Sequence, residues 1–173
     1  MKKIIGISLL IAFFAFKNTI GVFDLTIMTP GGEDQSLAAY QGKKMMIVVL
    51  PVTQTTADSN LLELLDSLSI NYVDSINIVG IPSYEDGFKD DSIGSLITWY
   101  RSILGDQFII SGGMSTRKNS AYQTPLFSYL TNADQNGYFN DDVQGAGEKF
   151  FIDASGNLYA ISMPDADFDR DIF

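Results

Sequence analysis

The chain has 173 residues, of which 46% are apolar and 18% are charged, and this composition fits one globular domain of ordinary size. It contains no cysteine, which excludes disulfides, zinc–thiolate and iron–sulfur sites, thiol nucleophiles and dithiol redox motifs. It contains no histidine, so the usual metal ligand and the usual general base are also missing. The 11 basic and 21 acidic residues give a net charge of −10, which would repel a phosphate backbone, and we expect no nucleic-acid partner.

Residues 1–21 predict an export signal, either a cleaved signal peptide or a signal anchor. Lys2 and Lys3 precede an uncharged, mostly apolar stretch at 4–16, which is the pattern of a secretory signal. That stretch is shorter than the roughly 20 residues that span a bilayer. No A-x-A cleavage site follows it, so an uncleaved anchor with membrane association through residues 4–16 stays open. We expect an extracytoplasmic protein, either secreted or in the periplasm or cell envelope, with its folded domain at 22–164.

The domain begins with extended patterns. Apolar side chains recur at every second position over 22–28, which predicts a strand. A short amphipathic segment follows around Leu37 and Tyr40. The continuous apolar run at 45–50 is typical of a strand buried on both faces, so we expect it at the centre of the sheet.

A helix and a second buried strand are predicted next. The helix is expected to be capped by Asp58 or Ser59, and its leucines repeat at helical spacing over 61–68. The apolar run at 76–81 then predicts the strand. This alternation favours parallel strands joined by helices.

Two further helices have recognisable starts. Asp91 or Ser92 is expected to cap a helix whose apolar face extends over 93–104. A short helix over 125–130 should follow Thr124, because proline suits the first turn of a helix.

The last part of the domain predicts a hairpin. Short strands at 149–153 and 158–162 are separated by turn residues. The polar, Gly-rich segment at 131–148 is interpreted as a surface loop, and residues 165–173 as an acidic C-terminal tail. The order of elements predicts an α/β domain with a central mixed β-sheet flanked by helices.

Three local patterns suggest chemistry that their surroundings do not support. Residues 115–118 match the S-x-x-K signature of penicillin-recognising enzymes, but the K-T-G strand of those enzymes is missing. Residues 134–145 resemble a calcium loop, with Phe139 where glycine is needed and Gly145 where glutamate is needed. The alternating aspartates of the tail at 165–173 are expected to be solvated. We therefore expect no metal site and no cofactor.

Acidic pairs follow the second buried strand. Glu85-Asp86 and Asp90-Asp91 flank a turn there. Sites of α/β proteins form at the carboxyl edge of the sheet, so position alone makes these residues candidates.

Five segments resemble glutathione peroxidases and occur in the same order as in that family. The similarity extends from about residue 22 to 164. It implies the thioredoxin-like fold of that family, with a central mixed sheet flanked by helices. The segments are Phe23-Asp24-Leu25 with the following Gly-Gly turn, an L-x-x-Y-x-G-K run at 37–43, V-G-I-P at 79–82, T-P-L-F-S-Y-L at 124–130, and K-F-F-I-D with its glycine at 149–156.

The resemblance also implies where the redox centre should lie, and there the chain departs from the family. Counted without gaps from Gly42-Lys43, the peroxidatic cysteine or selenocysteine corresponds to Gln54, next to Thr55. The supporting glutamine of the family corresponds to Glu85, and its W-N-F segment to Gly-Ala-Gly at 145–147. A carboxamide cannot become a thiolate, whereas this chemistry needs a nucleophile that is oxidised and then reduced again by a thiol. Gln54, Thr55 and Glu85 thus mark a vestigial site, in which the Glu85 charge would oppose a thiolate.

We therefore expect a glutathione-peroxidase-like pseudoenzyme outside the cytoplasm, with no catalytic residues, that works by binding protein partners. A structural subunit of an envelope assembly is a variant of this prediction. The alternative is a residual oxidoreductase of the peroxidase family that uses Glu85 or tyrosine and lysine groups in place of cysteine.

Overall fold

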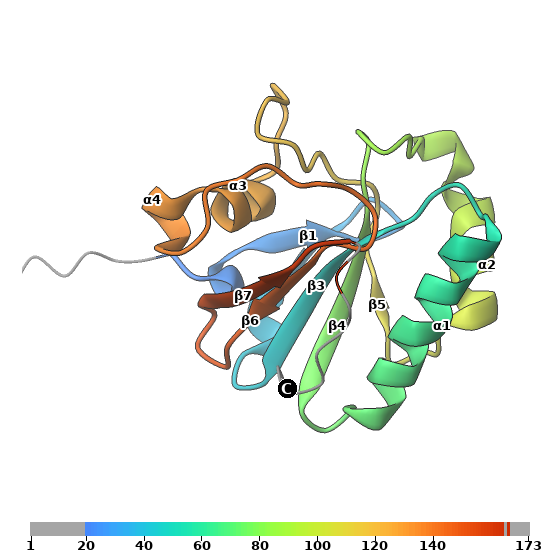
Figure 1. Cartoon of the computed structure of the whole chain (residues 1–173), viewed down its shortest axis with the longest axis horizontal. Coiled ribbons are helices and arrows are strands. Elements are labelled where there is room, and N and C mark those ends of the chain that lie inside the picture. Colours follow the sequence, from blue (N-terminus) through green and yellow to red (C-terminus); the bar gives the residue numbers. More distant parts are fainter. Residues whose placement is uncertain (1–19, 165, 167–173) are drawn as a thin grey trace, which may run out of the picture.

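The apolar run at 45–50 forms a strand at the centre of a five-stranded mixed sheet, whose strand order is β5-β4-β3-β6-β7 (Figure 1). β3 runs parallel to β4 and antiparallel to β6, and β1 and β2 form a separate antiparallel pair. The structure is a computed structural model that describes residues 20–164 and 166. Its 3₁₀ helices (η), strands and α-helices are, in chain order, η1 (Val22–Asp24), β1 (Thr26–Met28), β2 (Asp34–Ser36), η2 (Leu37–Tyr40), β3 (Lys44–Leu50), α1 (Thr56–Asn71), β4 (Ile76–Pro82), η3 (Asp90–Ser92), α2 (Ile93–Ile103), β5 (Ile109–Ile110), α3 (Pro125–Thr131), α4 (Ala133–Asn136), β6 (Lys149–Ile152) and β7 (Leu158–Ser162).

Two predicted segments lie almost entirely outside the described residues. Of the predicted export signal at 1–21, only the last two residues are described, and of the predicted tail at 165–173 only Ala166. The domain limits of 22–164 therefore stay a prediction. Within residues 20–164 and 166, no helix combines the length and the apolar character needed to cross a membrane.

The central strand divides the apolar core into two halves. Its side chains alternate between the faces of the sheet, so Met46 and Val48 pack with α1 and α2, whereas Met45 and Ile47 pack with α3 and β1. Figure 1 shows the two groups of helices on opposite sides of the sheet. Every residue from Met45 to Leu50 is fully buried, which confirms the predicted central strand. Each such side chain stabilises the fold by about 1.5–3 kcal/mol relative to an exposed one.

The predicted helices are present, but the first begins earlier than expected. Thr55 caps α1, and Asp58 lies in its first turn, where its carboxylate accepts a hydrogen bond from the backbone N–H of Thr55. The prediction of Asp58 or Ser59 as the cap is therefore wrong, because a capping box places its acidic residue three positions inside the helix. α2 follows Ser92 and α3 follows Thr124, at the predicted positions, but neither side chain forms a capping hydrogen bond.

The strand predicted over 22–28 is only half correct. The 3₁₀ helix η1 takes its first part, and the carboxylate of Asp24 accepts a hydrogen bond from the N–H of Gly21 at 2.8 Å. Val22 and Phe23 are neighbours in the chain and are both buried, which one half-exposed strand would not allow. Strand β1 is confined to Thr26–Met28.

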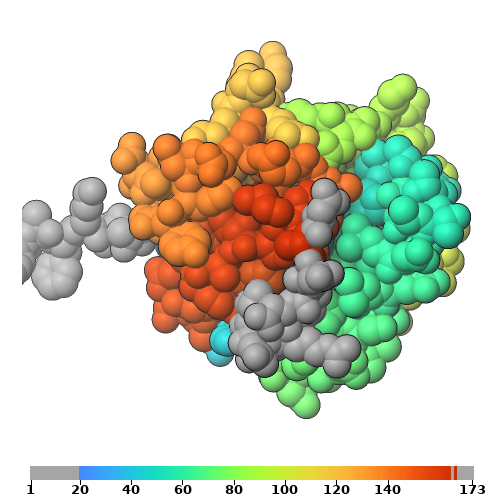
Figure 2. Space-filling model, viewed as in Figure 1, coloured from blue at the N-terminus to red at the C-terminus, as the bar shows by residue number. Residues whose placement is uncertain are grey.

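The segment at 131–148 is less exposed than its polar composition predicts. It contains the short helix α4, and the side chains of Val143 and Glu148 are fully buried. In Figure 2 its orange surface continues into the red surface of the β6–β7 hairpin. The hairpin itself pairs as predicted, with β6 antiparallel to β7.

Candidate functional site

The turn between β3 and α1 contains Gln54, the position that the family resemblance assigns to the nucleophile. Gln54 is exposed and has a φ of +57°, and within the described residues it is the only residue other than glycine with a positive φ. The left-handed conformation costs an ordinary residue about 1–2 kcal/mol. Retained backbone strain of this kind is often found at functional sites, but here the strained residue has a carboxamide side chain without redox chemistry.

The polar side chains beside Gln54 are already used to start the helix. Thr53 Oγ1 donates a hydrogen bond to Asp58 Oδ2 at 2.6 Å. The N–H of Asp58 donates to Thr55 Oγ1 at 3.2 Å, and the N–H of Thr55 donates back to Asp58 Oδ2 at 3.0 Å. Burial alone raises the pKa of Asp58, but these hydrogen bonds outweigh it and hold the pKa below its usual value. The turn is therefore a satisfied helix cap.

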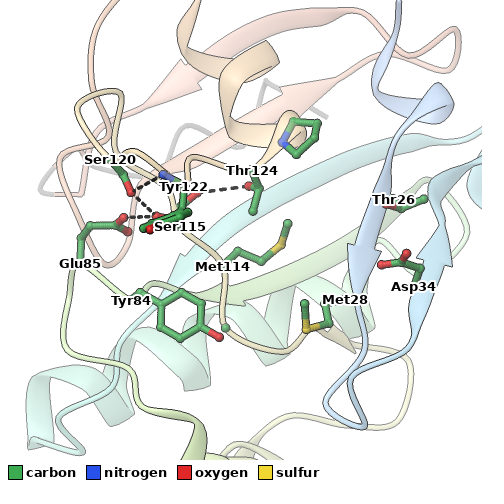
Figure 3. Close-up of a pocket in the computed structure, with 12 residues that line it drawn as sticks. Thr26, Met28, Asp34, Tyr84, Glu85, Met114, Ser115, Ser120, Tyr122 and Thr124 are labelled. Atoms are coloured by element: carbon green, nitrogen blue, oxygen red, sulfur yellow. Dashed lines mark hydrogen bonds between the residues drawn. The ribbon is translucent and has the colours of Figure 1, made fainter.

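Glu85 lies in the turn after β4 and is bound to a segment 30 residues further along the chain. Its carboxylate accepts hydrogen bonds from Ser115 Oγ, from the N–H of Thr116 at 2.9 Å and from Ser83 Oγ at 3.1 Å. Ser120 Oγ lies 2.6 Å from Ser115 Oγ and extends the same network (Figure 3). Burial by itself raises the pKa of Glu85, but the hydrogen bonds lower it to about 2, so this carboxylate is ionised at neutral pH.

The neighbouring residue, Asp86, fastens the same two segments through an ion pair. Arg117 Nη2 lies 3.0 Å from Asp86 Oδ1, and the guanidinium also donates to the carbonyl groups of Val143 and Gln144. Gly145 lies against both charged groups, because a Cβ added there would lie 3.6 Å from Asp86 Oδ1 and 3.7 Å from Arg117 Nη2. Gly145, which the resemblance aligns with the family's tryptophan, thus lies beside an ion pair.

Two further ionisable groups are buried where the chain enters β6. The side chain of Glu148 accepts a hydrogen bond from the N–H of Gln144, and its second oxygen is buried without a hydrogen bond. Burial raises the pKa of Glu148 and lowers the pKa of Lys149, whose Nζ donates to the carbonyl oxygen of Gly147 at 2.7 Å. Both residues are buried at the entry to the strand, and neither presents a reactive group to solvent.

The three predicted site residues lie in two separate polar networks. Gln54 and Thr55 belong to the turn before α1, whereas Glu85 belongs to the network with Ser115 and Thr116. Among the described residues, no hydrogen bond or ion pair joins Thr55 to Glu85. The same part of the chain contains no group of three or more acidic side chains placed to hold a metal ion.

Sequence reasoning missed the partners of Glu85. Residues 115–118 match an S-x-x-K pattern, but in the structure Ser115, Thr116 and Arg117 bind the turn after β4. The signal in the sequence was the run of hydroxyl and basic residues at 115–118 in a Gly-rich segment. It does not indicate which of the acidic pairs this run binds.

The fold defines the class of protein. The crystal structure of Trgpx in apo form superposes with a TM-score of 0.62 at 18% identity and covers 85% of this chain and 87% of its own. The crystal structure of T. cruzi GPX1 superposes with a TM-score of 0.60 at 12% identity and covers 84% of this chain and 87% of its own. A thiol:disulfide interchange protein of the thioredoxin family from Chlorobium tepidum TLS superposes with a TM-score of 0.56 at 17% identity. This match covers 86% of this chain and 88% of the other. The chain has a thioredoxin-like α/β fold.

Within the proteins of this fold, the sequence is similar to that of glutathione peroxidases. The glutathione peroxidase homolog BsaA of Staphylococcus aureus (strain MW2) is 29% identical over 139 residues, which cover 79% of this chain and 85% of the relative. Glutathione peroxidase 1 of Caenorhabditis elegans is 23% identical over 139 residues, which cover 79% of this chain and 83% of the relative. No protein-family model matches the chain. The protein is a distant glutathione peroxidase homologue that contains no cysteine.

Proposed function

We propose that this protein is a non-catalytic homologue of the glutathione peroxidases that works by binding, as an interaction or assembly module outside the cytoplasm. The observation that carries the proposal is the turn after β3. Where the resemblance places the redox nucleophile, the chain has Gln54 between two threonines whose hydroxyl groups are engaged with Asp58. Since the whole chain lacks cysteine and histidine, no thiolate can be formed or activated at any other position.

The remaining ionisable groups do not support the alternative of a residual oxidoreductase. Glu85, with a pKa of about 2, is a weak base at neutral pH. The hydroxyl of Tyr84 donates to Asp90, and this hydrogen bond, with burial, raises the pKa of Tyr84 to about 12. Lys149 is buried and bound to a backbone carbonyl group. None of these groups can accept and return the electrons that peroxide reduction requires.

A peroxidase assay tests the proposal. The purified, metal-free protein is mixed with hydrogen peroxide and either glutathione or thioredoxin, with an active glutathione peroxidase as the reference in parallel. We expect consumption at the uncatalysed rate, apart from slow stoichiometric oxidation of up to six methionines. Sustained consumption that saturates with peroxide would overturn the proposal.

The location outside the cytoplasm rests on residues 1–21, with Lys2 and Lys3 before an apolar stretch. Mass spectrometry of the native protein should find either an N-terminus near residues 16–22 or intact Met1 in the membrane fraction. A full-length protein in the soluble cytoplasmic fraction would contradict both forms of the prediction. This measurement is independent of the peroxidase assay.

A further inference from the structure

A cavity of about 550 Å³ lies between the β1–β2 hairpin and the two segments that Glu85 joins (Figure 3). Its size is within the range of about 300–1,000 Å³ that is typical of small-molecule sites. Much of its wall is apolar or aromatic, because Met28 and Met114 line it together with Tyr84, Tyr122 and Pro125. Tyr122 is 85% exposed, so this aromatic ring lines the cavity without being packed in the core.

The charged groups of the cavity wall are all negative. Asp34, on β2, and Glu85, after β4, line the cavity, and no lysine or arginine does. Figure 3 shows the two carboxylates on opposite sides, with Tyr84, Met114 and Met28 between them. The carboxylate of Asp34 forms no hydrogen bond or ion pair with any described residue, whereas the oxygens of Glu85 are shared with Ser115 and its neighbours. The cavity therefore has one carboxylate available to a ligand and a second that adds a fixed negative charge.

We propose that this cavity binds a small organic cation, with an aromatic or aliphatic body against Met28, Met114 and the tyrosines and an ammonium or guanidinium group facing Asp34. The charge of the wall opposes an anion, and the apolar surface favours a ligand with a hydrophobic body over a simple metal ion. The exposed face of Tyr122 can add a cation–π contact. The proposal goes beyond a role in binding protein partners, and it needs no redox chemistry.

A matched series of indole compounds tests the charge of the ligand. Tryptamine is the cationic probe, tryptophol is its neutral counterpart and indole-3-acetate its anionic counterpart. Each is titrated into ¹⁵N-labelled protein while backbone amide shifts are followed by NMR. We expect saturable shifts around residues 26–34 and 113–122 with tryptamine, binding of tryptophol weaker by about fivefold, the scale of one partly exposed ion pair, and no saturation with indole-3-acetate. Tryptamine binding should also weaken as salt is added.

Variants of the hairpin test the place of binding. Asp34→Asn should weaken tryptamine binding by about fivefold. Glu33→Gln removes the same charge one residue earlier, outside the cavity wall, and should leave the affinity within about twofold. Thr26→Trp places a large ring on the exposed side of β1 that lines the cavity, and it should abolish saturation without changing the charge.

The outcomes separate this proposal from the proposed function. Any one of four results would overturn the cation site. Two concern the probes: all three bind equally, or tryptamine shows no saturable binding at millimolar concentration. The other two are shifts confined to other surfaces and equal effects of Asp34→Asn and Glu33→Gln. None of these results bears on peroxide turnover. Conversely, peroxidase activity would overturn the non-catalytic role without affecting the cation site.

Discussion

The turns after β3 and after β4 end parallel neighbouring strands at the same edge of the sheet, yet they are held in different ways. The turn with Gln54 is stabilised by residues at most five positions apart, such as Thr53 and Asp58. The turn with Glu85 is bound to residues 115–117, about 30 positions away. The turn after β3 is a local helix cap, whereas the turn after β4 joins two distant parts of the chain. Gln54 therefore lies in a turn held by local contacts, whereas Glu85 joins segments that are distant in the chain.

The largest effect should come from breaking the distant network. Glu85→Ala leaves Ser115 and the buried N–H of Thr116 without their acceptor, and we expect the free energy of unfolding to fall by about 2–3 kcal/mol. Urea denaturation measures the change. Glu63→Ala on the exposed side of α1 is the matched control and should change it by less than about 0.5 kcal/mol. Equal effects of the two variants would show that the network contributes no stability.

The free energy of unfolding should depend on pH through Glu85. Because the pKa of Glu85 is about 2 in the folded protein and 4.5 is its ordinary value, its ionised form stabilises the fold above pH 4.5, and this contribution is lost as the pH falls from 4.5 towards 2. Glu148 acts in the opposite direction, since burial raises its pKa and its ionisation at higher pH destabilises the fold. We expect Glu85→Gln to flatten the fall in stability below pH 4.5, measured by urea denaturation at several pH values. An unchanged acid slope would contradict the assignment.

A smaller and opposite effect is expected in the local turn. Gln54→Gly should raise the free energy of unfolding by about 0.5–1 kcal/mol, because glycine adopts a φ of +57° without steric cost. Gln41→Gly is the matched control, since Gln41 is also exposed but has a φ of −59°. There, glycine should lower stability by about 0.4–1 kcal/mol through the entropy of the unfolded chain. Loss of stability in both variants would show that Gln54 is not strained.

The smallest effect should follow from restoring a thiol. Gln54→Cys places it before the N-terminus of α1, which favours the thiolate, and we expect alkylation by iodoacetamide but peroxide reduction no faster than that of Gln41→Cys, an exposed thiol elsewhere. Adding Glu85→Gln should raise the alkylation rate at neutral pH, since it removes a negative charge. An unchanged rate would show that the two turns are electrostatically independent. Rapid peroxidase turnover by Gln54→Cys alone would show that the site lacks only a thiol nucleophile for catalysis.

The sequence by itself determined the central strand, the two longer helices, the short helix after Thr124 and the final hairpin. In each, the signal is local: the apolar run at 45–50, helical spacing of leucines at 61–68, or turn residues between short strands. Such patterns are repeated over several residues, so the hydrophobic effect imposes them almost independently of the rest of the chain. The absence of a thiol nucleophile was likewise fixed by composition alone.

Only the tertiary structure decided what surrounds Gln54 and Glu85. The sequence contains many hydroxyl groups and carboxylates, and nothing local distinguishes Ser115 and Thr116 as the partners of Glu85. The same limit applies to the 3₁₀ helix at 22–24, where the N–H of Val22 donates to the carbonyl oxygen of Gly156, far along the chain. Strand β5 was missed for another reason, because its two residues are too few to show a period. The cavity beside Asp34 is formed by segments nearly 100 residues apart. Contacts between distant segments depend on how the sheet and its connections pack, and a period of two or of 3.6 residues carries no information about them.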